Sequence, residues 1–170
     1  MNRKVEKALN EQIHAEFFSF YLYLSVAAYF TSNHLDGFAH WMRIQAQEEF
    51  GHAMKLFDFL NERGGTVELM ALSAPTHEWP SPSAAVESVL NHERAISQRI
   101  NDLVDLATAE NDHATTVMLH WYVNEQVEEE ATADTLFHQV KMVESSPHGL
   151  LMIDRELAGR PAPALIAGEQ

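Results

Sequence analysis

Glu48-Glu49-Phe50-Gly51-His52 is the most informative stretch of the chain, because it sets two titratable side chains on the apolar side of a helix. Apolar residues recur there in steps of three and four, which is the pattern of an amphipathic helix facing a core. Glu49 and His52 both fall on this core-facing stripe and are three residues apart, so they point to the same side. A carboxylate and an imidazole in that position destabilise a fold unless partners satisfy them.

Three other stretches carry the same pattern, an apolar helical stripe interrupted by polar side chains near its middle. The interruptions are Glu16 in the first stretch, Glu93 in the third, and Gln126 with Glu129 in the fourth. The spacing forms an internal repeat, since the interval from Glu16 to Glu49 equals the interval from Glu93 to Gln126.

The intervals also predict that the polar residues of each helical hairpin meet at one depth. If the chain reverses near His34, Glu16 lies as far before the turn as His52 lies after it. A reversal near Asn111 gives the same symmetry for the carboxylates of the second hairpin. Two packed hairpins would therefore bury a single layer of four carboxylates, one histidine and one glutamine.

Such a layer predicts a metal site. Four buried carboxylates repel one another, and no Lys or Arg lies on the stripes near their level. Two divalent cations would balance their charge, and oxygen-rich ligation with one imidazole suits Fe, Mn or Zn. The alternative for any single residue is a protonated or water-bridged polar side chain in the core. Six such residues in register favour the metal.

Composition narrows the class of protein. The 170 residues are 46% hydrophobic, which fits one domain with a substantial core. A net charge of −14 argues against nucleic acid or an anionic membrane as a partner. The absence of Cys excludes disulfides, Fe–S clusters and rubredoxin-type iron. The chain starts without a signal-peptide pattern, and its longest apolar run is too short for a membrane span, so we expect a cytoplasmic protein.

The fold expected is all-α, a four-helix bundle with one long crossover and a short fifth helix. Residues 65–81, which include prolines, can reach about 56 Å when extended, and a helix of 28 residues is about 42 Å long. The crossover can therefore run the length of the bundle. Residues 1–158 would form one domain and residues 159–170 a loose tail. The expected helices cover residues 2–31, 35–63, 82–110, 113–144 and 147–157.

The first helix is apolar on two sides between Phe17 and Phe30, and a helix of this kind is buried on both sides. One side faces its own bundle, and the other most simply faces a second subunit. The alternative is an unusually apolar surface. The residues expected off the core stripe are Phe17, Phe18, Tyr21, Leu22, Val26, Ala28 and Tyr29.

Four motifs on these stripes are shared with a known family. They are Asn10-Glu11-Gln12 with Glu16, Gln47-Glu48-Glu49 with His52, His92-Glu93, and the stretch from Trp121 to Glu130. With them the chain resembles the non-haem ferritins of bacteria and archaea, a ferritin-like di-iron family, from Leu9 to Leu157. The resemblance implies iron storage and detoxification by a ferroxidase. Such an enzyme oxidises Fe(II) with O₂ or peroxide and deposits ferric mineral inside a hollow homo-oligomer of about 24 subunits.

The resemblance also implies roles for individual residues. Glu16, Glu49 and His52 match the first iron site, and Glu49 bridges to a second site held by Glu93 and Glu129. These five residues would form the ferroxidase centre.

Two further side chains match groups beside that centre. Gln126 matches a nearby amide. Bacterioferritins repeat their Glu-x-x-His motif at this place, whereas this chain has Gln126-x-x-Glu129. We therefore expect the second iron site to be weaker and to suit iron in transit better than a permanent cofactor. Tyr23 matches a tyrosine beside the centre, although its spacing fits a core tyrosine equally well. Phe50 stands where bacterioferritins place their haem-ligating Met, so we expect no haem.

Acidic residues just off the stripe resemble the third iron site of bacterial ferritins. Their spacing alone fits solvated charges on a helix face equally well. The residues concerned are Glu48, Glu125 and Glu128, together with Glu129.

Three rival functions follow from the same pattern: a di-iron oxidase of an organic substrate or peroxide, a cage subunit that only nucleates mineral, and a DNA-protecting mini-ferritin. The missing Cys removes the rubrerythrin form of the di-iron oxidase, and the weak second metal site argues against a permanent di-iron cofactor. The complete set of metal ligands argues against a cage subunit that only nucleates mineral. The negative charge repels DNA, and mini-ferritins take their ligands from the first two helices, which argues against the third.

Overall fold

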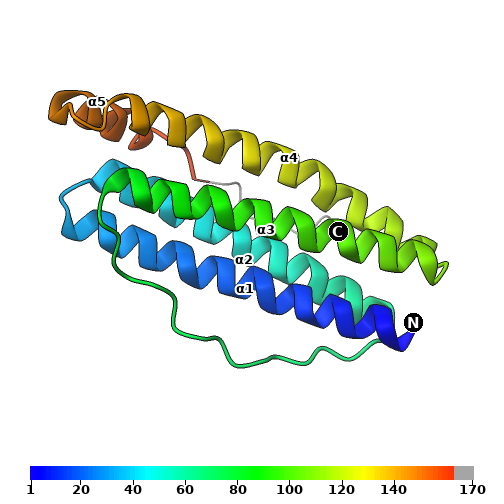
Figure 1. Cartoon of the computed structure of the whole chain (residues 1–170). Helices are drawn as coiled ribbons and strands as arrows, with labels where there is room; N and C mark the ends of the chain where they lie inside the picture. Colours follow the sequence, from blue (N-terminus) through cyan, green and yellow to red (C-terminus); the bar gives the residue numbers. More distant parts are fainter. Residues whose placement is uncertain (163–170) are drawn as a thin grey trace.

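The computed structural model describes residues 1–162, which form five helices and no strand (Figure 1). The predicted all-α fold is confirmed, and every helix end lies within two residues of its predicted position. Part of the predicted tail, residues 163–170, lies outside the described residues. The helices are α1 (Arg3–Ser32), α2 (Asp36–Glu62), α3 (Pro82–Ala109), α4 (His113–Met142) and α5 (Pro147–Leu157).

Local sequence explains where the helices begin and where the chain turns. Ser81 caps α3 by accepting a hydrogen bond from the Ala84 amide, and Pro82 follows in the first turn. Asp112 caps α4 in the same way. The two predicted reversals are found at His34 and Asn111, whose φ angles of 58° and 55° are left-handed, as is common just after a helix.

The long crossover runs along α1 from the end of α2 to the start of α3, as predicted (Figure 1). Hydrogen bonds attach it to α1 at two levels. The Asn10 side-chain Nδ2 donates to the Thr66 carbonyl at 2.9 Å, and the Ser25 hydroxyl donates to the Thr76 carbonyl at 2.6 Å. This path makes α3 parallel to α2 and brings the two hairpins together.

The hydrophobic core is divided into two clusters by a polar layer. On α1 the division falls between Ile13 and Leu22, and on α3 it falls between Leu90 and Ile96. All six predicted polar residues lie between the two clusters on the four long helices, and all six are buried. The helices therefore present the layer at one depth.

The outward side of α1 is narrower than the sequence predicts. Leu22 and Val26 were expected off the core stripe, yet they are buried within the chain's own core. Tyr21, which was expected off the stripe, does face outward with 44% of its surface exposed. Leu24, which was not in the expected set, also faces outward and is 38% exposed. The predicted core-facing stripe of α1 is too narrow. Because α1 packs against α2 on one side and α3 on the other, a wider arc of its surface is buried.

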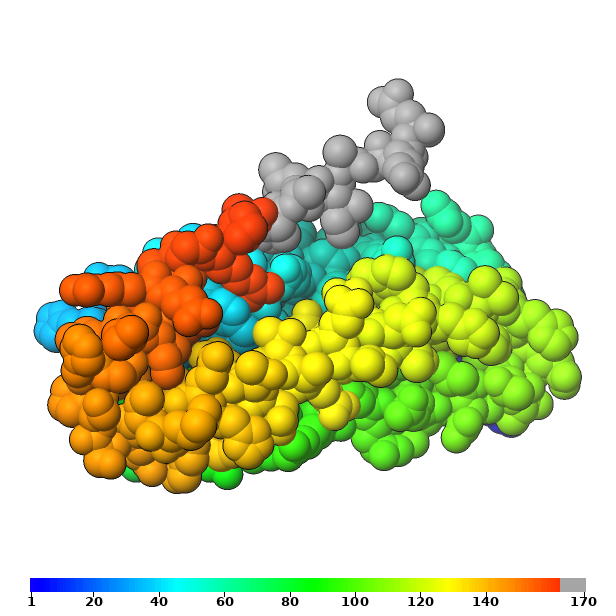
Figure 2. All heavy atoms as spheres, turned by 90° about the horizontal axis from the view of Figure 1, so that it is seen from above, coloured from blue at the N-terminus to red at the C-terminus, as the bar shows by residue number. Residues whose placement is uncertain are grey.

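The short helix α5 lies at the end of the molecule where α4 ends and α2 begins (Figure 2). The Phe38 backbone amide donates to the Asp154 side chain at 3.0 Å and joins α5 to the first turn of α2. Among the described helices, none combines the length and the apolar character that a bilayer-spanning segment needs.

Candidate metal centre

Six buried polar side chains from four helices make up the layer. None of them has more than 8% of its surface exposed. Their chain positions place one member on α1, two on α2, one on α3 and two on α4. They are Glu16, Glu49, His52, Glu93, Gln126 and Glu129.

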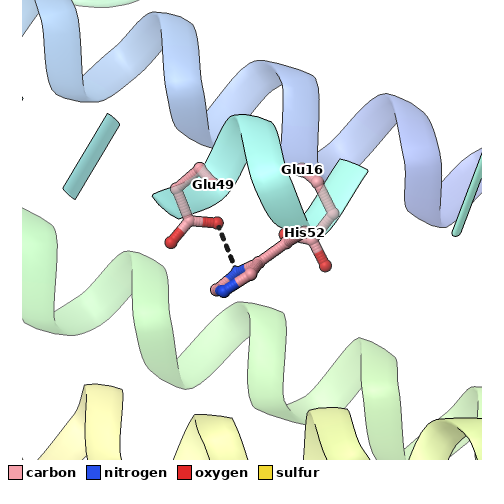
Figure 3. Close-up of side chains that lie close together, drawn as sticks. All are labelled: Glu16, Glu49 and His52. Atoms are coloured by element: carbon pink, nitrogen blue, oxygen red, sulfur yellow. Dashed lines mark ion pairs between the residues drawn. The ribbon is translucent and has the colours of Figure 1, made fainter. Parts of the chain in front are cut away.

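The residues predicted for the first site converge (Figure 3). Glu16 from α1 and Glu49 and His52 from α2 each offer a ligand atom, and these atoms lie within 4.8 Å of one another. His52 Nδ1 is 3.4 Å from Glu49 Oε2. Glu16 Oε2 and Glu49 Oε1 are buried with no hydrogen-bond partner. Buried carboxylate oxygens without a partner are costly, so this arrangement fits a cation between them.

Glu93 and Glu129, predicted for the second site, are held by hydrogen bonds from neighbouring helices. Glu93 accepts from the Tyr23 hydroxyl and from Gln126 Nε2, the latter at 3.2 Å. Glu129 Oε2 accepts from Gln45 Nε2 at 2.7 Å. Tyr23 and Gln126 therefore both contact the Glu93 carboxylate directly, and Glu93 satisfies the Tyr23 hydroxyl.

Burial dominates the electrostatics of the layer. It raises the pKa of Glu93 to about 7, although hydrogen bonds from Tyr23 and Gln126 lower it. Burial, followed by the charge of Glu93, raises the pKa of Glu129 to about 7. Burial also raises the pKa of Glu49 well above its ordinary value, and the charges of Glu93 and Glu16 add to this. Without metal, the layer therefore retains protons near neutral pH, and a divalent cation can replace them.

Comparison with known proteins agrees with this geometry. Residues 6–143 match the ferritin-like domain family. The chain belongs to the ferritin family. A bacterial non-heme ferritin from Bacteroides fragilis is 41% identical over 160 residues, covering 94% of this chain and 99% of the relative. One from Staphylococcus saprophyticus is 35% identical, covering 94% and 96%.

Solved structures give the same result. The open-pore ferritin of the archaeon Archaeoglobus fulgidus is 50% identical, with a TM-score of 0.94, and the match covers 95% of this chain and 99% of that one. A closed form of the same ferritin, engineered by mutagenesis, is also 50% identical, has a TM-score of 0.93, and covers 95% and 98%. The resemblance to non-haem ferritins is thus confirmed.

The acidic residues predicted for a third site lie in different surroundings in this ferritin. Glu125 Oε1 is 4.0 Å from His52 Nε2, and ligand atoms of Glu125, His52 and Glu129 lie within 4.8 Å of one another. Glu48 forms an ion pair with Arg160 at 2.8 Å, and Glu128 is exposed. Burial raises the pKa of Glu48, and the Arg160 guanidinium counters this in part. The third site stays a prediction.

Two glutamines beside the centre, Gln12 and Gln45, are not predicted as site residues from the sequence. Gln12 donates to Glu16 Oε1 at 2.8 Å, and Gln45 donates to Glu129. A signal was available, because the interval from Gln12 to Gln45 equals the interval from Glu16 to Glu49, and each glutamine precedes a site glutamate by one helical turn. They belong to the same internal repeat as Glu16 and Glu49.

Proposed function

We propose that this ferritin stores iron by oxidising Fe(II) with O₂ at paired sites in the polar layer and depositing the product as ferric mineral. The ferritin family supports iron storage. The observation that carries the proposal of oxidation is the pair of unpartnered carboxylate oxygens, on Glu16 and Glu49, that lie beside His52.

Charge and protonation suit the layer to two substrate ions. Four carboxylates balance the charge of two Fe(II), one held by Glu16, Glu49 and His52 and the other by Glu49, Glu93 and Glu129. Fe(II) binding displaces the protons that burial keeps on the carboxylates. Two Fe(II) supply two electrons, which together with two protons reduce one O₂ to hydrogen peroxide. Burial of the layer keeps bulk water away from the reacting ions.

The second site suits iron in transit. It offers no histidine, and Gln126 occupies the position beside Glu93 as a hydrogen-bond donor at 3.2 Å. Without an imidazole ligand this site holds its ion less tightly than a Glu-x-x-His site would, which favours its use by iron in transit. We propose that Glu48, Glu125, Glu128 and Glu129 form a third iron site on the exit path of the ferric product. An ion bound there would replace Arg160 Nη2 as the partner of the Glu48 carboxylate. The approach of Glu125 to Glu129 and His52 supports this path.

Single substitutions in the second site test the oxidation. Glu93→Ala and Glu129→Ala should each slow the oxidation of two Fe(II) per chain, by about 100-fold if the lost ligand is worth close to 3 kcal/mol in the transition state. Glu87→Ala, at an exposed position of the same helix α3, is the matched control and should oxidise iron normally. Wild-type rates in both site variants would refute the assignment. Stopped-flow absorbance of the ferric product measures these rates.

We further propose that the chains assemble into a hollow cytoplasmic shell of about 24 subunits, as the family resemblance implies. Exposed apolar side chains support assembly. They include Tyr21 and Leu24 on α1, Phe50 on α2, and Leu69, Met70 and Leu72 in the crossover. The fold matches both open and closed forms of one archaeal ferritin, so it is compatible with either kind of shell.

Solution mass tests the assembly. A shell of about 24 chains of 19.2 kDa has a mass of about 460 kDa. Light scattering across a range of salt concentrations should give this value. Tyr21→Arg, which places a charge among these apolar side chains, should lower it. A wild-type mass near that of one or two chains would refute the shell.

A further inference from the structure

Gln12 links the first site to an arginine on a different helix. Its side chain is 2% exposed, and its Nε2 donates to Glu16 Oε1 at 2.8 Å. Its Oε1 accepts from Arg99 Nε at 3.2 Å. Arg99, on α3, is fixed from a second direction because its Nη2 donates to the Glu11 carbonyl at 2.9 Å.

Gln45 makes the corresponding link at the second site. It is 1% exposed, its Nε2 donates to Glu129 Oε2 at 2.7 Å, and its Oε1 accepts from Arg160 Nη1. Arg160 lies beyond α5, outside the four-helix bundle. Its Nη2 reaches both oxygens of Glu48, at 2.8 Å and 3.1 Å, and its guanidinium carbon is 5.1 Å from the centre of the Trp41 ring.

The two links are chemically equivalent. A glutamine amide has a donor end and an acceptor end, and a half-turn of its terminal torsion exchanges them. The carbonyl end facing a carboxylate would be repelled by it. Arginine only donates, so it can bind only the carbonyl end of the amide. The arginine therefore fixes the NH₂ group toward the carboxylate.

This orientation determines which carboxylate oxygen remains for metal. In the first link, Gln12 holds Glu16 Oε1, and the other oxygen, Oε2, is buried without a partner. If the amide turned over, Glu16 would lose that hydrogen bond and could rotate away from Glu49 and His52. Gln45 likewise holds Glu129 Oε2, and turning its amide over would break that hydrogen bond.

We propose that Arg99 and Arg160 are positioning residues of the metal centre, each acting through one glutamine on the carboxylate of one site. Arg99 and Gln12 orient Glu16 of the first site, and Arg160 and Gln45 orient Glu129 of the second. The segment after α5 is thus a part of the centre. The inference rests on the proposed function, because it assigns these carboxylates to metal.

Anaerobic Co(II) titration of the assembled protein tests the inference without redox chemistry. Wild-type chains should bind two Co(II) at the paired sites. Arg160→Gln should weaken one binding constant roughly 10–100-fold, the range found for groups that orient metal ligands, and leave the other unchanged. Arg99→Gln should weaken the other. Paramagnetically shifted NMR signals of the His52 imidazole report which site has lost its metal. Arg155→Gln, at an exposed position on α5, is the matched control and should bind as wild type does.

A double-mutant cycle separates the proposed relay from other roles of Arg160. If Arg160 acts through Gln45, adding Arg160→Gln to Gln45→Leu should change Co(II) affinity no further. A guanidinium that acted only as a nearby positive charge would repel the metal, so Arg160→Gln would tighten binding and overturn the inference. Lower melting temperatures in the arginine variants with unchanged binding constants would also overturn it. A wild-type chain that binds fewer than two Co(II) would instead overturn the proposed function.

Discussion

The buried carboxylates give the metal-free protein an unusual dependence on pH. Burial raises the pKa of both Glu93 and Glu129 from 4.5 to about 7, so the folded state holds more protons than the unfolded chain between these values. Their contribution to stability is complete below pH 4.5 and is lost as the pH rises through 7. For a shift of this size the loss is roughly 3 kcal/mol per carboxyl group.

We therefore predict that the melting temperature of chelator-treated protein falls as the pH rises from 5 to 8. Fe(II) without oxygen, or Zn(II), should restore it by binding the folded state. A variant with Glu16, Glu49, Glu93 and Glu129 all changed to Gln should fold, lose this dependence on pH and metal, and fail to oxidise iron quickly. If that variant does not fold, the layer is structural. A wild-type melting temperature that rises over this pH range would contradict the assigned pKa shifts.

A site residue can be predicted from the sequence when a periodic pattern connects it to the other site residues. Glu16, Glu49 and Glu93 interrupt helical stripes at regular intervals, so their meeting in one layer was predictable. Arg160 follows α5 and belongs to no periodic pattern, and its contact with Gln45 depends on how the chain folds back after α5. Such a contact requires three-dimensional positions.

At the scale of elements, the attachment of α5 depends on one glycine. A Cβ atom on Gly37, in the first turn of α2, would lie 1.7 Å from the Asp154 carbonyl oxygen of α5. Because that atom is backbone, α5 as a whole would have to move. The hydrogen bond from the Phe38 amide to Asp154 would be broken, and Arg160, a short distance along the chain from Asp154, would shift with it.

Gly37→Ala should therefore displace α5 and destabilise the chain by about 1–3 kcal/mol, as overpacking does. Hydrogen exchange should become faster in α5 while the four long helices stay protected. Gly159→Ala is the control, since its Cβ would lie 3.3 Å from its nearest neighbour, the Glu156 carbonyl oxygen, a distance that a small shift relieves. Unchanged exchange in α5 of Gly37→Ala would show that the packing is looser than the structure indicates.

Helix ends and the course of the crossover were predictable because each has a local cause. Ser81 with Pro82 and Asp112 are capping residues, and the length of residues 65–81 leaves the crossover free to run the whole bundle. The width of the buried arc on α1 was not predictable, because Leu22 and Val26 are buried by neighbours on two sides.

At the scale of the whole molecule, the negative charge and the polar layer favour the same ligand. A net charge of −14 raises the local concentration of cations around the protein. The layer then offers the one place among the described residues where buried carboxylate oxygens lack partners. We propose that this layer holds two Fe(II) per chain during fast oxidation.

The stoichiometry of the fast phase tests that claim most directly. Fe(II) is added in increments to metal-free protein in aerated buffer, and the amplitude of the fast phase is measured by stopped-flow absorbance. The amplitude should rise linearly and then break at about two Fe(II) per chain, because four carboxylates balance two divalent ions. A break at one Fe(II) per chain, or a fast phase that grows without a break, would contradict the account.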